Sequence, residues 1–106
     1  MFNGLLAAAI IVATPAIAFA NHATNAMDAF KEANDAMMHG MMPSLTGGAD
    51  KDFVMMMIPH HQGAIDMANI ELKYGKDETL RAMAKAIVEA QEKEIGEMKD
   101  WQAKHP

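Results

Sequence analysis

The sequence predicts an all-α fold, a small antiparallel bundle of three helices. Apolar residues recur at steps of three and four along three segments, and no alternating, strand-like run follows residue 20. A loop rich in Gly, Pro, Ser and Thr and a very short turn separate the three segments. The length of 106 residues fits one domain. Because the core of so short a chain is limited, we expect ferritin-like or four-helix-bundle-like packing that self-association, as a homo-oligomer, could complete.

The first twenty residues differ in kind from the rest. They carry no charged side chain, and the apolar run Leu5–Ala13 is followed by Pro15 and an A-x-A site that ends at Ala20. This pattern predicts a secretory signal peptide, because a membrane-spanning helix needs about 18 apolar residues or more. No Lys or Arg precedes the apolar run, so an uncleaved anchor or an apolar N-terminal helix is the alternative. We predict a signal peptide at 1–20 and an exported, periplasmic helical domain at 21–106 that is not inserted in a membrane.

The first helix of this domain is predicted over 25–41. Asn25 and Asp28 have the spacing of a capping pair, and Gly40 and Pro43 lie near the end of the helix. One face carries the apolar and amide residues Met27, Phe30, Asn34, Met37 and Met41.

The second helix is predicted over 51–74, after a loop at 42–49 that contains Pro, Ser, Thr and two Gly. Asp50 is expected to cap its start and Gly75 to follow its last residue. Pro59 lies inside this segment and lacks a backbone N–H, so we expect a kink there or the start of a new segment.

The third helix is predicted from Glu78 to about Lys104, with Asp77 as its cap. Only Gly75–Asp77 connects it to the second helix, so the two should be antiparallel neighbours. Its predicted inward stripe consists of Leu80, Met83, Ala84, Ile87, Gln91, Ile95, Met98 and Trp101.

The composition excludes several classes of function. The chain has twelve Met, five His and no Cys, with a formal net charge of −5. Without Cys there is no disulfide scaffold, thiolate zinc site or cysteine nucleophile, and the acidic balance argues against a nucleic-acid binder. The sequence also lacks the H-E-x-x-H, Glu-x-x-His and G-x-S-x-G motifs and a phosphate-binding Gly loop. We therefore do not expect an enzyme.

Methionine and histidine gather in the segment 55–61, M-M-M-I-P-H-H. Side chains four residues apart share a helix face, which pairs Met56 with His60 and Met57 with His61. Met67 extends the stripe of His60. Adjacent histidines point about 100° apart, so they need help from another helix to hold one ion.

A second cluster ends the first helix, and it consists of Met37, Met38, His39, Met41 and Met42. On the third helix, Met98 and Glu94 lie one turn apart, and Glu94 is a candidate buried carboxylate that could hydrogen-bond an imidazole across the bundle. A methionine stripe is core more often than ligand. For Met27, Met67 and Met83 we therefore expect core positions, while His22 and His105 are expected to be solvated.

The clusters point to a soft metal. Thioethers select Cu(I), and imidazole suits both Cu(I) and Cu(II). Ag(I) would be bound by the same donors, whereas zinc and iron normally take Cys, His or carboxylates. In an oxidising compartment a Cys would risk disulfide formation, so thioether and imidazole are the soft or borderline donors that remain usable.

Two stretches also resemble a known family. The string M-I-P-H-H-Q-G-A-I-D-M-A at 57–68 is similar to the central motif of the CopM-like copper metallochaperones, a helical family long labelled a domain of unknown function. Residues 91–101 resemble that family's second motif, Q-x-x-E-I-x-x-M-x-x-W. The resemblance covers roughly Met27 to Trp101. Longer relatives hold extra or duplicated helices, whereas this chain holds one copy.

The resemblance implies an exported helical bundle that binds copper for resistance or trafficking. By position it implicates Met57, His60, His61, Met67, Glu94 and Met98. Our hypothesis is a periplasmic chaperone or copper buffer that holds Cu(I), and Cu(II) through its histidines. Its thioethers would be exchanged one at a time for those of a copper-transfer partner protein. The alternative is a non-metal helical interaction module of the periplasm; a copper-dependent oxidoreductase is a weaker third class.

Overall fold

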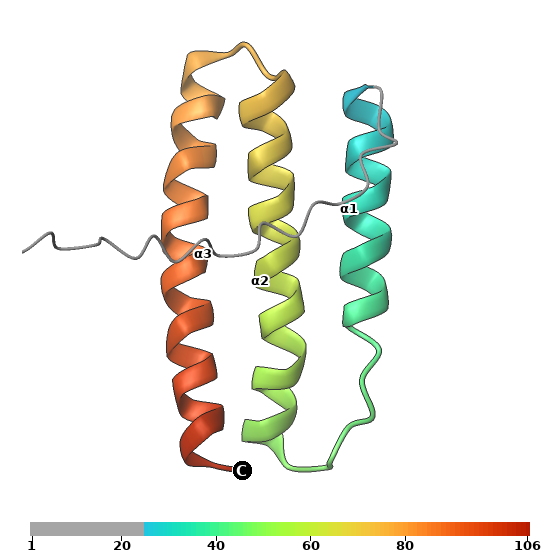
Figure 1. The fold of residues 1–106 in the computed structure, drawn as a ribbon, viewed down its shortest axis with the longest axis vertical. Coiled ribbons are helices and arrows are strands. Elements are labelled where there is room, and N and C mark those ends of the chain that lie inside the picture. The colour runs from blue at the N-terminus through green and yellow to red at the C-terminus, as the bar shows by residue number, and fades with distance from the viewer. Residues whose placement is uncertain (1–24) are drawn as a thin grey trace, which may run out of the picture.

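The computed structural model describes residues 25–106 and contains three helices. They are α1 (Ala26–Gly40), α2 (Ala49–Tyr74) and α3 (Glu78–Lys104), and the described residues include no strand (Figure 1). The predicted all-α fold, a small helical bundle, is confirmed, and the helix bounds agree with the prediction to within two residues. The predicted signal peptide at 1–20 lies outside the described residues.

Two helices begin where local capping signals predict. At α1, the Asp28 N–H donates to Asn25 Oδ1 at 3.0 Å, and the Asn25 side-chain amide donates back to the Asp28 carboxylate at 3.0 Å. At α3, the Leu80 N–H donates to Asp77 Oδ1 at 2.8 Å. The bonds from the Asp28 and Leu80 N–H groups each satisfy a backbone donor that the first helical turn leaves without a partner.

The predicted cap of α2 is wrong. Gly48 occupies the cap position, and Asp50 lies inside the helix. Asp52 stabilises this end instead, because its carboxylate accepts from the Thr46 N–H at 2.8 Å, the Thr46 hydroxyl at 2.8 Å and the Gly47 N–H at 2.9 Å. These hydrogen bonds, chiefly those from Thr46, hold the pKa of the Asp52 carboxyl below its ordinary value. The carboxylate thereby ties the loop to the first turn of α2.

Proline 59 does not divide α2, which runs as one helix from Ala49 to Tyr74. Of the two outcomes expected from the sequence, a new segment is therefore wrong. Pro59 lies at the contact with α1, where a Cβ placed on Gly40 would be only 2.9 Å from Pro59 Cβ. The glycine leaves room for the proline ring.

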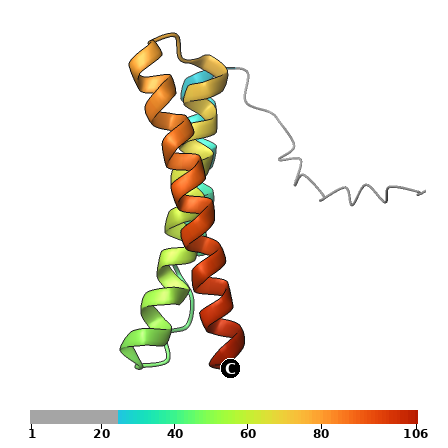
Figure 2. The ribbon, with the colours of Figure 1, turned by 90° about the vertical axis from the view of Figure 1, so that its left-hand side faces the viewer.

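The three helices form a single layer. α2 packs against α3 on one side and α1 on the other, whereas α1 and α3 do not touch. Figures 1 and 2 show this arrangement from the face and from the edge of the layer. The turn between α2 and α3 is fastened by Arg81, whose guanidinium donates to the carbonyls of Leu72 at 2.6 Å and Gly75 at 3.1 Å.

An open layer has a thin core. The buried apolar residues are Ala33, Val54, Ile65, Ala68, Ala84 and Ile95, and no side chain among the described residues is completely enclosed. None of the described helices is long and apolar enough to cross a bilayer.

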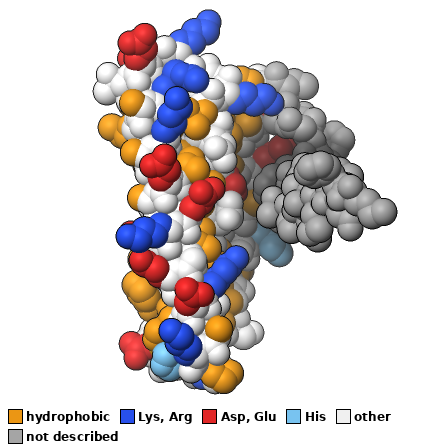
Figure 3. Space-filling view, turned by 60° about the vertical axis from the view of Figure 1, so that its left-hand side comes forward, with side chains coloured by type: hydrophobic (Ala, Val, Ile, Leu, Met, Phe, Trp, Pro, Cys, Tyr) orange, Lys and Arg blue, Asp and Glu red, His pale blue; other side chains and the backbone are white. Residues whose placement is uncertain are grey.

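The predicted core positions of three methionines are wrong. Met27, Met67 and Met83 are 61%, 37% and 53% exposed. Residues advance by 100° along each right-handed helix, and neighbouring helices run antiparallel. Measured from the residues at the helix contacts, Met27, Met67 and Met83 therefore turn toward the same face of the layer, each within an apolar stripe of its helix. The stripe continues through Phe30 and Phe53, and none of the helices in residues 25–106 covers it. Figure 3 shows the charged outward side of α3, with apolar side chains along its left-hand edge.

Candidate metal centre

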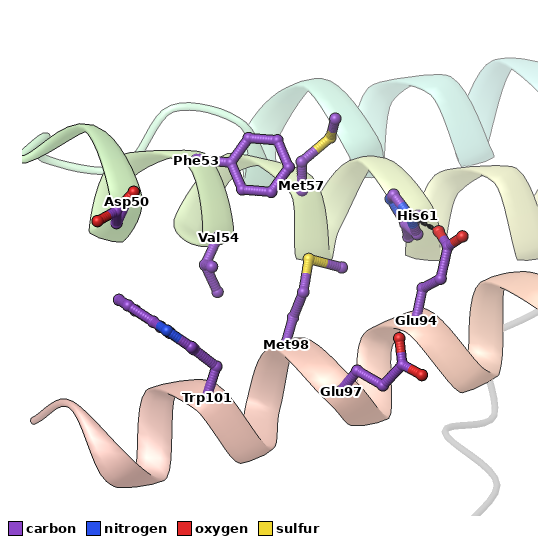
Figure 4. Close-up of a pocket in the computed structure, with 9 residues that line it drawn as sticks. All are labelled: Asp50, Phe53, Val54, Met57, His61, Glu94, Glu97, Met98 and Trp101. Carbon is purple, nitrogen blue, oxygen red and sulfur yellow. Dashed lines mark hydrogen bonds and ion pairs between the residues drawn. The ribbon is translucent and has the colours of Figure 1, made fainter.

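An open cleft of about 560 Å³ lies between the first half of α2 and the second half of α3 (Figure 4). Its walls combine thioether, imidazole, carboxylate and aromatic side chains. The lining residues are Asp50, Phe53, Val54, Met57, His61, Glu94, Glu97, Met98 and Trp101. Four of the residues predicted as metal ligands or their partners therefore meet here.

Histidine 61 is held across the cleft by a carboxylate. Its Nε2 pairs with Glu94 Oε2, which joins α2 to α3. The imidazole is only 13% exposed and Glu94 is 51% exposed. The predicted hydrogen bond between Glu94 and an imidazole is confirmed, but the carboxylate lies at the mouth of the cleft and is not buried.

The second ring nitrogen of His61 lacks a partner. Nδ1 is shielded from solvent and makes no hydrogen bond within the described residues. When Nε2 carries the hydrogen that Glu94 accepts, Nδ1 presents a free lone pair. A buried acceptor without a partner costs free energy, which a bound cation would offset. Histidine ligands commonly have this arrangement, one nitrogen toward the metal and the other on a carboxylate.

The thioethers come from both helices. Met57 precedes His61 by one turn on α2, and Met98 follows Glu94 by one turn on α3. No group of three His, Asp or Glu side chains in the described part of the chain is placed to hold a metal. The thioethers are the remaining soft donors in this cleft, and thioether with imidazole is a donor set suited to Cu(I).

The other predicted ligands lie outside this cleft. His60 is exposed, and its ring lies 6.2 Å from that of His61, centroid to centroid, at 61°. Met37 is a packing residue, because a Cβ on Gly63 would lie 2.5 Å from Met37 Sδ. Met38, His39, Met42 and Met67 are exposed, and Met41 and Met56 are half-buried.

Several lining residues were not predicted. Trp101 and Glu97 belong to the second motif, and Trp101 also lies on the predicted inward stripe of α3, so that stripe could have identified it. Phe53 precedes Met57 by one turn and could have been found in the same way. Gln91 does not line the cleft, but it lies on the predicted inward stripe of α3, and its Oε1 is buried without a hydrogen-bond partner among the described residues.

The family comparison covers nearly all of the chain. No curated protein matches it. Residues 7–102 match the family described as a domain of unknown function (DUF305). The chain therefore belongs to the DUF305 family, whose description assigns no activity.

Proposed function

We propose that this protein binds copper and that the cleft between α2 and α3 holds Cu(I). The observation that carries the proposal is the state of His61, whose ring is fixed by Glu94 and whose buried Nδ1 has no partner. Met57 and Met98 line the same cleft and would complete a sulfur–nitrogen donor set.

The donor set fits Cu(I) better than a harder ion. Cu(I) is soft, and thioether and imidazole need no cysteine and stay usable in an oxidising compartment. Glu94 would act as the hydrogen-bond partner of His61, orienting the ring without binding the metal itself. The opening of the cleft would let a partner's methionine replace Met57 or Met98 one donor at a time.

The cellular role that we propose rests on the sequence. The predicted signal peptide and the resemblance to the CopM-like metallochaperones support an exported, periplasmic protein. A chaperone and a copper buffer both use such a site. They differ in whether a periplasmic partner protein takes the copper, and Ag(I) would bind to the same donors.

Competition with a chromophoric Cu(I) chelator tests the site. We expect the protein to withdraw Cu(I) from the chelator. The triple variant Met57→Leu, His61→Gln, Met98→Leu should lose at least about 100-fold in affinity at the cleft, roughly 2.8 kcal/mol. Methionine-to-leucine changes conserve volume, and circular dichroism would confirm that the helices remain. The double variant Met27→Leu, Met83→Leu is the matched control. Absence of competition by the wild-type protein would refute the proposal.

The exposed apolar face favours a second candidate, a helical interaction module that binds no metal. Phe30, Phe53 and Met67 contribute to this face. Apolar patches of this kind commonly mark interaction sites. This candidate predicts that Phe30→Ser, outside the cleft, abolishes binding to a partner protein, while the triple cleft variant leaves it unchanged. The copper proposal predicts loss of metal with the fold retained.

A further inference from the structure

We infer a second, separate soft-metal site between α1 and α2, formed by Met38, Met41, Met56 and His60. The inference rests on the proposed copper function but concerns different donors. It divides the two adjacent histidines between two sites, one beside α1 and one beside α3. One chain would then hold two ions.

The contact between α1 and α2 determines which residues of the two helices lie at the same height along the layer. Gly40 lies against Pro59, and Met37 lies against Gly63. Because the helices are antiparallel, each step along α1 matches a step back along α2. Met41 therefore lies level with Ile58, and Met38 lies level with His61. Both thioethers thus come from the last turn of α1 and the residue that follows it, beside the Met–His segment of α2.

Because α1 and α2 approach each other closely, side chains of both helices can bind the same metal ion. Gly40 and Gly63 lack side chains at the contact, and a Cβ on either would come within 3 Å of Pro59 or Met37. A methionine side chain can span the short distance left between two helices in such contact. Met37 fills the contact itself, which removes it from the donor set.

Met56 and His60 share a stripe of α2 distinct from that of Met57 and His61. The two stripes differ by 100° around α2, and the His60 and His61 rings are inclined at 61° to each other with centroids 6.2 Å apart. Met41 and Met56 are half-buried, while Met38 and His60 are exposed. The donors therefore span the edge of the α1–α2 contact, where an ion can enter from solvent.

Titration with Ag(I), a redox-inert ion that takes the same donors, tests the inference. We expect two ions per chain, read from the methyl NMR signals of the methionines. The variant Met38→Leu, Met41→Leu, Met56→Leu, His60→Gln should retain one ion. That ion should still change the fluorescence of Trp101, which lines the α2–α3 cleft. The cleft triple variant should also retain one ion, without a change in Trp101 fluorescence.

The outcomes separate the two proposals. No binding of Ag(I) or Cu(I) by the wild-type protein overturns the copper function and the second site together. One ion per chain, unaffected by the four substitutions between α1 and α2, overturns the second site alone. His60→Gln by itself, which leaves all packing methionines in place, should weaken one binding step and spare the Trp101 response. A Trp101 response that changes with His60→Gln would mean a single shared site and would overturn the inference.

Discussion

On its α3 side, α2 presents Met57 and His61 to a helix that supplies a carboxylate and a thioether. Met56 and His60 repeat the Met-x-x-x-His spacing one residue earlier, and we infer that they share a site with thioethers of the first helix, α1. His61 is shielded and fixed by Glu94, whereas His60 is exposed and no hydrogen bond to its ring is seen within the described residues. The comparison teaches that identical local spacing acquires different chemistry from the neighbouring helix. Under the proposed function, the α3 side would hold metal more tightly and the α1 side would exchange it faster.

The largest effect is expected from Gly63→Val, which should disrupt the α1–α2 side of the molecule and leave the α2–α3 side in place. A Cβ at this position would lie 2.5 Å from Met37 Sδ and 2.9 Å from Met37 Cβ, so α1 must move away. We expect a loss of about 3 kcal/mol in the free energy of unfolding, the upper end for overpacking.

Urea denaturation measures this loss. Metal titration should show that only the α1–α2 site is lost. Gly96→Val is the matched control, because a Cβ at Gly96 would meet nothing within 4 Å. An equal effect of both variants on metal binding would contradict the proposed independence of the two sides.

The next effect is that of Glu94→Gln, which removes the charge that holds His61. The amide can still accept a hydrogen bond, so the fold should persist. We expect Cu(I) affinity at the α2–α3 cleft to fall on the order of 10–100-fold, the usual effect of losing the partner of a ligating histidine. Chelator competition measures this loss, and Glu92→Gln, on the exposed side of α3, is the control. The affinity of the α1–α2 site should not change.

Local sequence signals predicted the helices. Most of the structural features that the sequence did not predict depend on contacts between residues that are distant in sequence. The caps Asn25 and Asp77 act within three residues, so their role is visible in sequence. At the start of α2, the local capping rule predicted Asp50, but the stabilising carboxylate is that of Asp52. This outcome depends on the loop residue Thr46, whose backbone N–H and hydroxyl both donate to Asp52. This loop conformation has no local sequence signal.

In the candidate site, too, local periodicity predicted some features, and helix packing decided the others. Periodicity identified which residues share a face, including Met57 with His61. Periodicity could not indicate that α1, α2 and α3 leave the face of Met27 and Met83 uncovered, because that depends on α1 and α3 lying apart. Nor could it separate Met37, which packs on Gly63, from its neighbours in the same cluster.

A smaller effect is expected from Asp77→Ala, which removes the cap of α3. The Leu80 N–H would lose its acceptor, at a cost of about 1 kcal/mol. Because α3 carries only the α2–α3 side, amide hydrogen exchange should quicken at the start of α3 and remain unchanged in α1. Asn25→Ala is the converse variant, expected to quicken exchange in α1 alone. Faster exchange in both helices with either variant would show that the two sides unfold together.

The smallest effect is expected from Asp52→Asn, at the loop that connects α1 to α2. The folded-state pKa of Asp52 is held below its ordinary value by donors from Thr46 and Gly47, so the ionised form stabilises the fold. That contribution is fully present above the unfolded-state pKa, about 3.9, and is lost as pH falls through the lower folded value.

Melting temperatures at pH 7 and near pH 2 measure the contribution of Asp52. Asp52→Asn should melt slightly below the wild type at pH 7, and the difference should shrink in acid. Asp50→Asn, at the predicted but unused cap, should show no such dependence. Because the loop leads only to α1, the variant should loosen the α1–α2 side and leave the pairing of His61 with Glu94 intact. An equal difference at both pH values would mean that Asp52 acts through its shape and that its charge does not stabilise this loop.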